Sequence, residues 1–269
     1  MPRLSVIIPT YNRNDLLSNC LNCLAPEVQL LSLNDYEVIV SDDNTDSQTK
    51  KLIEDSFPWV KWVEGPKMGP AANRNNGVKV AQGEWLLFTD DDCLPTDRWI
   101  SAYSNEIKSG AAKVLEGLTD AERPRKRFDE ESPLNLHGGC LWSCNFAIEK
   151  KLFYEVGCFD EEFPFAAMED LDFHRRVKSK EKIVFVPGAK VIHPWRIVKP
   201  FKGYKKWIFS NRYFMAKHNI KVDKSFRFLR IKILINQFFS SSALLVKYSF
   251  KGLGFFLEKI WFNVLMVFL

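Results

Sequence analysis

The sequence predicts an α/β fold with a mainly parallel sheet flanked by helices, followed by a basic, aromatic helical region. Short apolar runs typical of strands buried on both faces alternate with helix-length segments through the first hundred residues. This alternation favours parallel pairing, because each helix returns the chain to the same end of the sheet. With 46% hydrophobic residues among 269, the chain can bury a sizeable core, which excludes collagen-like, disordered and small disulfide-rich classes.

The first four strands and three helices follow one another along residues 4–88. Pro9 is expected to stop the first strand. Thr45 or Asp46 can cap the second helix, and the third opens at Gly69-Pro70, because Pro is favoured at the first helical position. The expected strands are 4–8, 36–40, 59–63 and 84–88, and the expected helices are 14–24, about 46–55 and about 70–83.

The middle of the chain, about 111–195, is less regular. The segment Glu122–Glu131 is charged and contains Pro124, which predicts a mobile loop. A turn at Pro187-Gly188 is expected to separate two short strands. The expected elements here are a strand at 140–148, a helix starting near Glu169, and strands at 183–186 and 190–193.

Charge divides the chain into two regions, 1–195 and 196–269. The second holds 15 Lys or Arg against Asp223 and Glu258, a net charge of +13, whereas the first carries a net charge of −8. A basic, aromatic segment of this kind favours a polyanionic surface as partner.

The basic tail, 196–269, is expected to form helices that lie in the plane of a membrane interface. Its longest apolar runs, Ile233–Val246 and Ile260–Leu269, are short for a bilayer span. A helical pair that packs on the first region or on a partner subunit is the alternative. The expected membrane anchors are Phe238, Phe239, Phe255, Phe256, Trp261 and Phe262.

Three consecutive carboxylates, Asp90, Asp91 and Asp92, follow the expected strand at 84–88. Like charges repel and acidic residues are disfavoured in strands, so a divalent cation would relieve the repulsion. Mg²⁺ and Mn²⁺ prefer such oxygen ligands and often add the phosphates of a substrate. A solvated acidic turn is the alternative interpretation.

Polar residues at three expected strand ends should face one crevice, because ligands of open α/β sheets bind beyond the carboxyl ends of the strands. The three segments are 9–11, 42–43 and 90–92. The chain has no G-x-G-x-x-G and no Walker A sequence, so dinucleotide and P-loop sites lose support.

Six short motifs follow one another along the first region: Ser5–Arg13, Val38–Asp43, Asn73–Gly77, Asp90–Asp92, Gly157–Glu161 and Met168–Phe173. In this order they resemble family 2 glycosyltransferases, over about residues 3–195. The resemblance implies the GT-A fold, an inverting reaction and a divalent metal, Mn²⁺ or Mg²⁺. It also implies that 1–110 is the nucleotide-binding half and 111–195 the acceptor half.

The resemblance assigns the nucleotide site to four residues. Pro9 and Tyr11 would lie against the base, and Asp43 would accept the imide N–H of a uracil. Arg74 would contact the diphosphate, where a charge-assisted contact is strong. The alternatives are a strand-to-helix turn at Asp43 and a surface helix charge at Arg74.

The resemblance also assigns the metal site. Asp92 would contact the metal directly, and Asp90 and Asp91 would hold the ribose or the waters of the metal. His193, at the end of an expected strand, matches the position of a further metal ligand. A lone His is more often structural, which is the alternative for His193.

Asp170 matches the catalytic base that removes a proton from an acceptor hydroxyl. Glu169 and Asp170 are also expected as acids at a helix N-terminus, a role compatible with catalysis. Trp142, Asn145 and Glu169 are assigned to the acceptor pocket, and Ser143 is expected to line it with Trp142 and Asn145. The approach to this pair, Phe163–Met168, departs from the Gly-rich pattern of the family and leaves the acceptor open.

The expected function is transfer of a sugar from a nucleotide-diphospho sugar to a glycan or lipid-linked acceptor in cell-surface polysaccharide synthesis. The alternatives are a non-catalytic membrane scaffold of the same fold and a nucleotidyltransferase. No nucleic acid is expected as partner, and an oligomer is left open. Because Met1-Pro2-Arg3 runs directly into a strand without a signal-peptide pattern, the cytoplasmic membrane face is the expected location.

Overall fold

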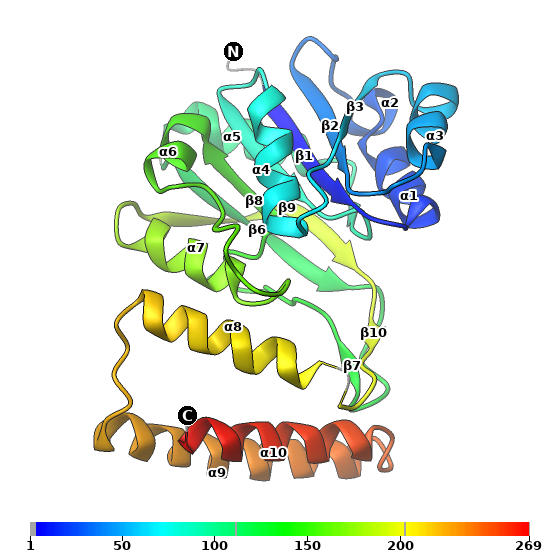
Figure 1. The fold of residues 1–269 in the computed structure, drawn as a ribbon. Coiled ribbons are helices and arrows are strands. Elements are labelled where there is room, and N and C mark those ends of the chain that lie inside the picture. Colours follow the sequence, from blue (N-terminus) through cyan, green and yellow to red (C-terminus); the bar gives the residue numbers. More distant parts are fainter. Residues whose placement is uncertain (1–3, 111, 202, 269) are drawn as a thin grey trace. The chain divides into compact units, whose positions relative to one another are not determined.

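The structure is a computed structural model that describes residues 4–110, 112–201 and 203–268 (Figure 1). Its contacts group the chain into two compact units. We call Met1–Ala121, Pro133–Glu162 and Glu169–Pro194 the sheet unit, and Glu122–Ser132, Phe163–Met168 and Trp195–Leu269 the helical unit. The expected boundary after residue 195 stays a prediction, since two earlier segments group with the tail.

The sheet unit contains an eight-stranded sheet in the order β3-β2-β1-β4-β8-β6-β9-β5. Strands β3, β2, β1 and β4 are parallel, as predicted, and β6 is parallel to β9, whereas β8 is antiparallel to both of its neighbours and β5 to β9. The α/β prediction is confirmed, with a sheet that becomes mixed beyond β4. The strands are β1 (Leu4–Thr10), β2 (Tyr36–Asp42), β3 (Val60–Glu64), β4 (Trp85–Thr89), β5 (Leu94–Pro95), β6 (Val114–Ala121), β8 (Asn145–Glu149) and β9 (Ile183–His193).

Six of the seven helices described in this unit contribute to two cores, one on each face of the sheet. Alternate residues of a strand point to opposite faces, so Ile8 joins the core with α1, α3 and α5 while Ile7 joins the core with α4, α6 and α7. The helices are α1 (Asn14–Leu24), α2 (Pro26–Gln29), α3 (Gln48–Ser56), α4 (Pro70–Val80), α5 (Trp99–Ser109), α6 (Lys150–Glu155) and α7 (Glu169–Lys178). Both faces are therefore covered, and the polar ends of the strands are left for ligands.

Three expectations about the strands are wrong. Strand β1 continues through Pro9 to Thr10, because its pairing with β4 has already ended at Ile7 and the missing N–H of Pro9 costs nothing there. Residues 183–193 form one strand without a turn at Pro187-Gly188, and the pairing with β6 shifts between Gly117 and Leu118 to absorb the irregularity. The strand expected at 140–148 covers only Asn145–Glu149.

The helical unit contains α8 (Tyr204–Lys217), α9 (Lys224–Lys247) and α10 (Leu253–Phe268). The segment expected as a loop, 122–131, contributes the short strand β7 (Glu130–Glu131), antiparallel to β10 (Arg196–Ile197). Phe255 and Phe256 pack with Phe128 and Leu245 in a local core, so these two aromatics are not exposed anchors as the sequence suggested.

Helix α9 is longer than the apolar run within it suggested. Among the described residues it is one helix whose length and composition would allow it to cross a membrane, and 6% of the relevant window is buried. A single such helix is weak support for a span. The charged ends of the helix lie outside the 14-residue run Ile233–Val246, which measures about 21 Å at 1.5 Å per residue against a hydrocarbon core of about 30 Å.

Candidate active site

The ends of β1 and β4 bring together two of the three consecutive carboxylates and an arginine. Thr10 Oγ1 donates a 2.7 Å hydrogen bond to Asp91 Oδ2. Arg13 approaches Asp91 Oδ1 at 2.7 Å and Asp92 Oδ2 at 3.0 Å. The buried carboxylates are thereby held by a guanidinium group of the protein itself, a role of Arg13 that the sequence analysis missed.

Arg74, on α4, is the second buried cation of the site. Its Nη2 lies 2.6 Å from Asp90 Oδ1, and its Nη1 lies 4.0 Å from Glu169 Oε1. Burial alone disfavours the charged guanidinium, but the carboxylates of Asp90, Asp170 and Glu169 raise the pKa of Arg74 above its usual value. Arg74 is therefore permanently cationic, and it faces the carboxylates expected at the donor site and at the acceptor site.

These two arginines correct the argument made from charge repulsion. The sequence suggested that Asp90, Asp91 and Asp92 lack a purpose without a divalent cation. In the structure Arg74 pairs with Asp90, and Arg13 pairs with Asp91 and Asp92. Repulsion alone therefore no longer requires a metal, and the case for one depends on which further ligands surround Asp92.

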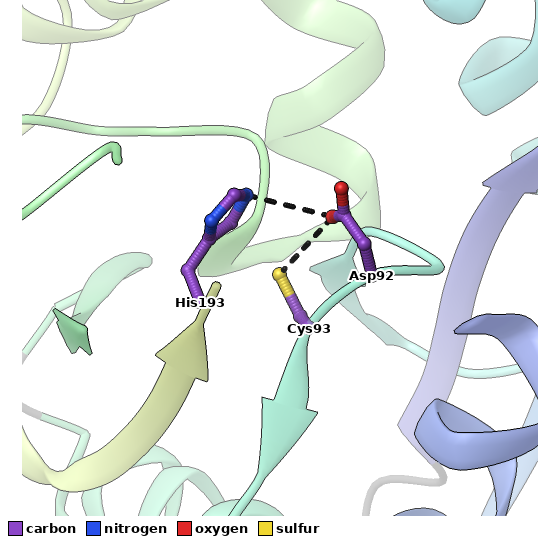
Figure 2. A group of neighbouring side chains, drawn as sticks. All are labelled: Asp92, Cys93 and His193. Carbon is purple, nitrogen blue, oxygen red and sulfur yellow. Dashed lines mark hydrogen bonds and ion pairs between the residues drawn. The ribbon is translucent and has the colours of Figure 1, made fainter. Parts of the chain in front are cut away.

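Asp92 lies beside a thiol and an imidazole (Figure 2). Its Oδ1 is 3.5 Å from His193 Nε2, at the end of β9, and 4.0 Å from Cys93 Sγ. The ligand atoms of the three buried residues all lie within 4.8 Å of one another. His193 Nδ1 lies 2.8 Å from the carbonyl oxygen of Pro194, which only accepts, so Nδ1 carries a proton and a neutral ring presents the Nε2 lone pair.

Asp170 lies in the first turn of α7, where Ser143 Oγ donates a 3.2 Å hydrogen bond to its Oδ2. Its Oδ1 is buried without a hydrogen-bond partner among the described residues. Burial raises the pKa of Asp170, and the negative charge of Asp90 adds to this, while Arg74 and the Ser143 hydrogen bond oppose it. A carboxylate with one free oxygen and a raised pKa suits a general base.

Asp43, just beyond β2, binds the loop that precedes α4. Its oxygens accept backbone N–H groups of Lys67 at 2.9 Å and Gly69 at 3.2 Å. Gly65 leaves the space that this contact needs, since a Cβ there would lie 2.2 Å from Asp43 Oδ1. Burial raises the pKa of Asp43, opposed by the two N–H groups. Asp43 therefore shapes the loop, and its role toward a nucleotide stays a prediction.

Of the residues assigned to the nucleotide base or to the acceptor pocket, Asn145 has a clear structural role. It is buried, its Oδ1 accepts from Trp99 Nε1 and Tyr103 Oη, both at 2.8 Å, and its Nδ2 donates to the carbonyls of Leu118 and Ala189. All four of its hydrogen bonds join β8 to β6, β9 and α5. No polar atom of Asn145 is left for a ligand, and its assignment to the acceptor pocket stays a prediction.

The other predicted residues differ in exposure. Tyr11 is 58% exposed at the end of β1, next to Asn12 with its positive φ of 54°, whereas Pro9 is buried. Trp142 is partly buried, with its Nε1 3.3 Å from the Leu134 carbonyl. Glu169 is buried beside Arg74. Of this group, Tyr11 follows the end of β1 and Glu169 begins α7, and both positions are next to the carboxylate site.

Three residues that the sequence analysis left without a site role join this network: Thr10, Arg13 and Cys93. Arg13 and Thr10 were part of a recognised motif, and their position at the end of a strand was a usable signal. Cys93 follows the acidic triplet directly. Ser143 was expected in the sugar or acceptor pocket, but its contact with Asp170, 27 residues away, had no signal in the sequence.

Comparisons with known proteins identify the family of this chain. The family model described as glycosyl transferase family 2 matches residues 5–157, and a second one, glycosyltransferase like family 2, matches residues 140–251. The chain belongs to glycosyl transferase family 2. The resemblance deduced from the motifs is thereby confirmed.

Two curated relatives are bacterial glucosyltransferases. The GalNAc(5)-diNAcBac-PP-undecaprenol beta-1,3-glucosyltransferase of Campylobacter jejuni is 31% identical over 178 residues, which cover 61% of this chain and 56% of the relative. The poly(ribitol-phosphate) beta-glucosyltransferase of Bacillus spizizenii is 36% identical over 143 residues, which cover 49% of this chain and 22% of the relative. This family 2 chain therefore spans about half or less of their length.

A solved structure supports the fold. The crystal structure of S. aureus TarS 1-349 in complex with UDP-GlcNAc has a TM-score of 0.59 and 23% identity, and the match covers 79% of this chain and 66% of that one. At this identity the likeness shows the fold, and the predicted GT-A fold is confirmed for the family 2 chain.

Proposed function

We propose that this chain is an inverting glycosyltransferase that moves a sugar from a UDP-linked donor to a hydroxyl of a glycan or lipid-linked acceptor. The observation that carries the proposal is the position of Arg74, which lies between Asp90 on the donor side and the α7 carboxylates on the acceptor side. One buried cation thus lies between the proposed donor site and the proposed acceptor site, which a sugar transfer must bring together.

The donor assignment is supported by the open end of the parallel strands. The Arg74 Nε and Nη1 atoms are buried without hydrogen-bond partners among the described residues, so they have donors to spare for a diphosphate. Tyr11 offers an exposed ring for stacking on a base. TarS, which shares the fold, has been crystallised with UDP and with UDP-GlcNAc.

The divalent cation expected for the family fits the residues present. Asp92 Oδ1 and His193 Nε2 are close enough for one cation, and the Nδ1 proton bound to the Pro194 carbonyl leaves the Nε2 lone pair for a metal. Asp92 and His193 would hold it. A bound Mn²⁺ or Mg²⁺ would neutralise charge on the leaving diphosphate.

The acceptor step is assigned to Asp170. Its free Oδ1 would take the proton of the acceptor hydroxyl while that oxygen attacks the anomeric carbon, and the bond to the diphosphate breaks as the new bond forms. One displacement inverts the configuration, so no second nucleophilic carboxylate is needed. Ser143 holds the other oxygen and orients the carboxylate.

Cell-surface glycan synthesis and a membrane location are proposed from the relatives and from the helical unit. The named relatives act on an undecaprenol-linked saccharide and on poly(ribitol-phosphate). In the helical unit Phe228 is 72% and Phe239 68% exposed on α9, within a tail of net charge +13. Apolar rings and basic residues together suit the interface of an anionic membrane, with α9 in its plane.

The decisive experiment incubates the full chain with Mn²⁺ and a panel of nucleotide sugars and measures the nucleotide released on adding undecaprenol-linked or polyol-phosphate acceptors. Release of UDP from one donor, dependent on acceptor, is expected. Calorimetry of UDP binding with Mn²⁺ should show a loss of metal-dependent affinity in Asp92→Ala.

Three other outcomes would contradict the proposal. UDP binding without transfer to any acceptor would favour the non-catalytic scaffold. Formation of a nucleotide sugar from a sugar phosphate and a nucleoside triphosphate would favour the nucleotidyltransferase. Equal affinity for UDP in Asp92→Ala and the parent would remove the metal assignment.

A further inference from the structure

The side chain next to the acidic triplet, Cys93, points at the same space as Asp92 and His193 (Figure 2). All three residues are almost fully buried, with exposed fractions of 4% or less. The two oxygens of Asp92 have different neighbours. Oδ2 is bound by Arg13, and Oδ1 is the oxygen close to His193 and Cys93. This arrangement places an oxygen, a nitrogen and a sulfur around one point.

The distances from Asp92 Oδ1 to the other two ligand atoms suit direct coordination by a single ion. Two ligand atoms bound to one Zn²⁺ at about 2.0–2.3 Å cannot lie more than about 4.3 Å apart. The Oδ1–Nε2 distance of 3.5 Å and the Oδ1–Sγ distance of 4.0 Å satisfy this limit. The Nδ1 contact with the Pro194 carbonyl is the outer hydrogen bond that orients a metal-bound imidazole.

We propose that Cys93 is a third protein ligand of the cation held by Asp92 and His193, and that it makes the site prefer Zn²⁺ or Co²⁺ over Mg²⁺. The inference rests on the proposed function, which supplies the other two ligands. On binding, the Cys93 S–H bond breaks, the proton leaves to solvent and the sulfur–metal bond forms. Thiolate and imidazole ligands favour Zn²⁺ and Co²⁺, whereas Mg²⁺ requires oxygen ligands, and Mn²⁺ lies between.

The chain offers a matched control for this ligand. Cys144 is a second buried thiol that hydrogen-bonds to Cys93 but does not belong to the three-residue cluster. Cys93→Ser and Cys144→Ser therefore make the same chemical change in the same core, and one of them removes the proposed ligand. Far-ultraviolet circular dichroism and thermal melting show whether each variant is folded.

The first test titrates the full chain with Co²⁺ and records the near-ultraviolet band of sulfur-to-cobalt charge transfer. The band should form at one equivalent, be absent in Cys93→Ser and persist in Cys144→Ser. The ratio of the Mg²⁺ to Zn²⁺ dissociation constants should fall by about tenfold or more in Cys93→Ser. Cobalt bound without the band, a band that persists in Cys93→Ser, or no cobalt binding with or without UDP would each overturn the proposal.

The second test needs no variant, so it remains decisive if Cys93→Ser fails to fold. X-ray absorption of the wild-type chain with one equivalent of Zn²⁺ should show a single sulfur at about 2.3 Å together with nitrogen or oxygen at about 2.0 Å. A shell of nitrogen and oxygen alone would overturn the role of Cys93. Donor binding and transfer measured with Mg²⁺ or Mn²⁺ would still support the proposed function in that case.

Discussion

The two units differ in the side chains that they bury. The sheet unit buries charged groups, whereas the helical unit exposes large apolar ones. In the sheet unit, Asp91, Asp92 and Arg74 are buried to 4% exposure or less, and each is paired with a partner of opposite charge. In the helical unit, large apolar side chains such as Phe228 and Phe239 are mostly exposed. Burying a charge costs several kcal/mol unless it is paired, and a contiguous exposed apolar surface marks an interaction site.

The difference teaches that the two units are suited to different ligands. Paired charges held in the interior are preorganised for a charged, water-excluded reaction such as transfer from a diphosphate. Exposed aromatic rings among the 15 basic residues of the tail, 196–269, would suit a surface that is both apolar and anionic. The following experiments test this contrast, from the largest expected effect to the smallest.

Asp170→Asn should lower kcat by about 10²–10⁴-fold, because the amide keeps the shape of the carboxylate and cannot take a proton. Binding of UDP should change little, since donor contacts are assigned to other residues. The measurement is kcat with the acceptor that the donor panel identifies, with Asp172→Asn as an acidic control on the same helix. A fall of less than tenfold would mean that Asp170 is not the base.

Asn145→Ala should destabilise the chain by about 3 kcal/mol, because it leaves donors of Trp99 and Tyr103 and two carbonyl groups unpaired in the interior. Asn263→Ala, which removes one bond to the Lys259 carbonyl on α10, should stay within about 0.5 kcal/mol. Urea unfolding of both variants measures the contrast. Equal losses of unfolding free energy in the two variants would show that the buried hydrogen bonds of the sheet unit contribute no more to stability than the single bond in α10.

The double variant Phe228→Ser/Phe239→Ser should bind anionic liposomes about tenfold or more weakly than the parent, since removing one buried Phe costs about 1.5–3 kcal/mol. Leu30→Ser, which alters an 80% exposed side chain of the sheet unit, should bind like the parent. Co-sedimentation at two ionic strengths measures both terms, because salt weakens the basic contribution. A full-length chain that ignores anionic liposomes would favour a protein partner for α9.

The pH dependence should report the raised pKa of Asp170. Since the base must be ionised, kcat/KM should fall on acidification at a pH above the ordinary range of an Asp carboxyl. The pKa of Asp170 is higher in the folded state than in the unfolded state, so its ionisation destabilises the folded chain. This cost is fully present at a pH above the folded pKa and disappears at a pH below the unfolded pKa. Asp170→Asn should therefore raise Tm at neutral pH, and the gain should vanish in acid; a gain that persists in acid would exclude this linkage.

Local patterns in the sequence were enough for the first half of the fold. Helix α1 begins and ends where apolar periodicity predicted, at Asn14 and Leu24, and the strands at 36–40 and 84–88 were found with small errors at their ends. Helix α5 and strand β6 were not predicted, although both are buried in the sheet unit. The position of β6 depends on its pairing with β8 and β9, which lie far along the chain.

The site, like the fold, has features that local sequence predicted and features that depend on contacts between distant segments. The sequence by itself determined the family, the parallel strands that end in carboxylates, and the candidates Asp92, Asp170 and His193, because these are carried by short motifs. Only the tertiary structure decided that Arg13 and Arg74 neutralise the triplet, that Asn145 is consumed by four internal hydrogen bonds, and that Cys93 faces Asp92 and His193. The physical reason is that pairing between charges and satisfaction of buried polar atoms depend on distances between segments that are far apart in the chain.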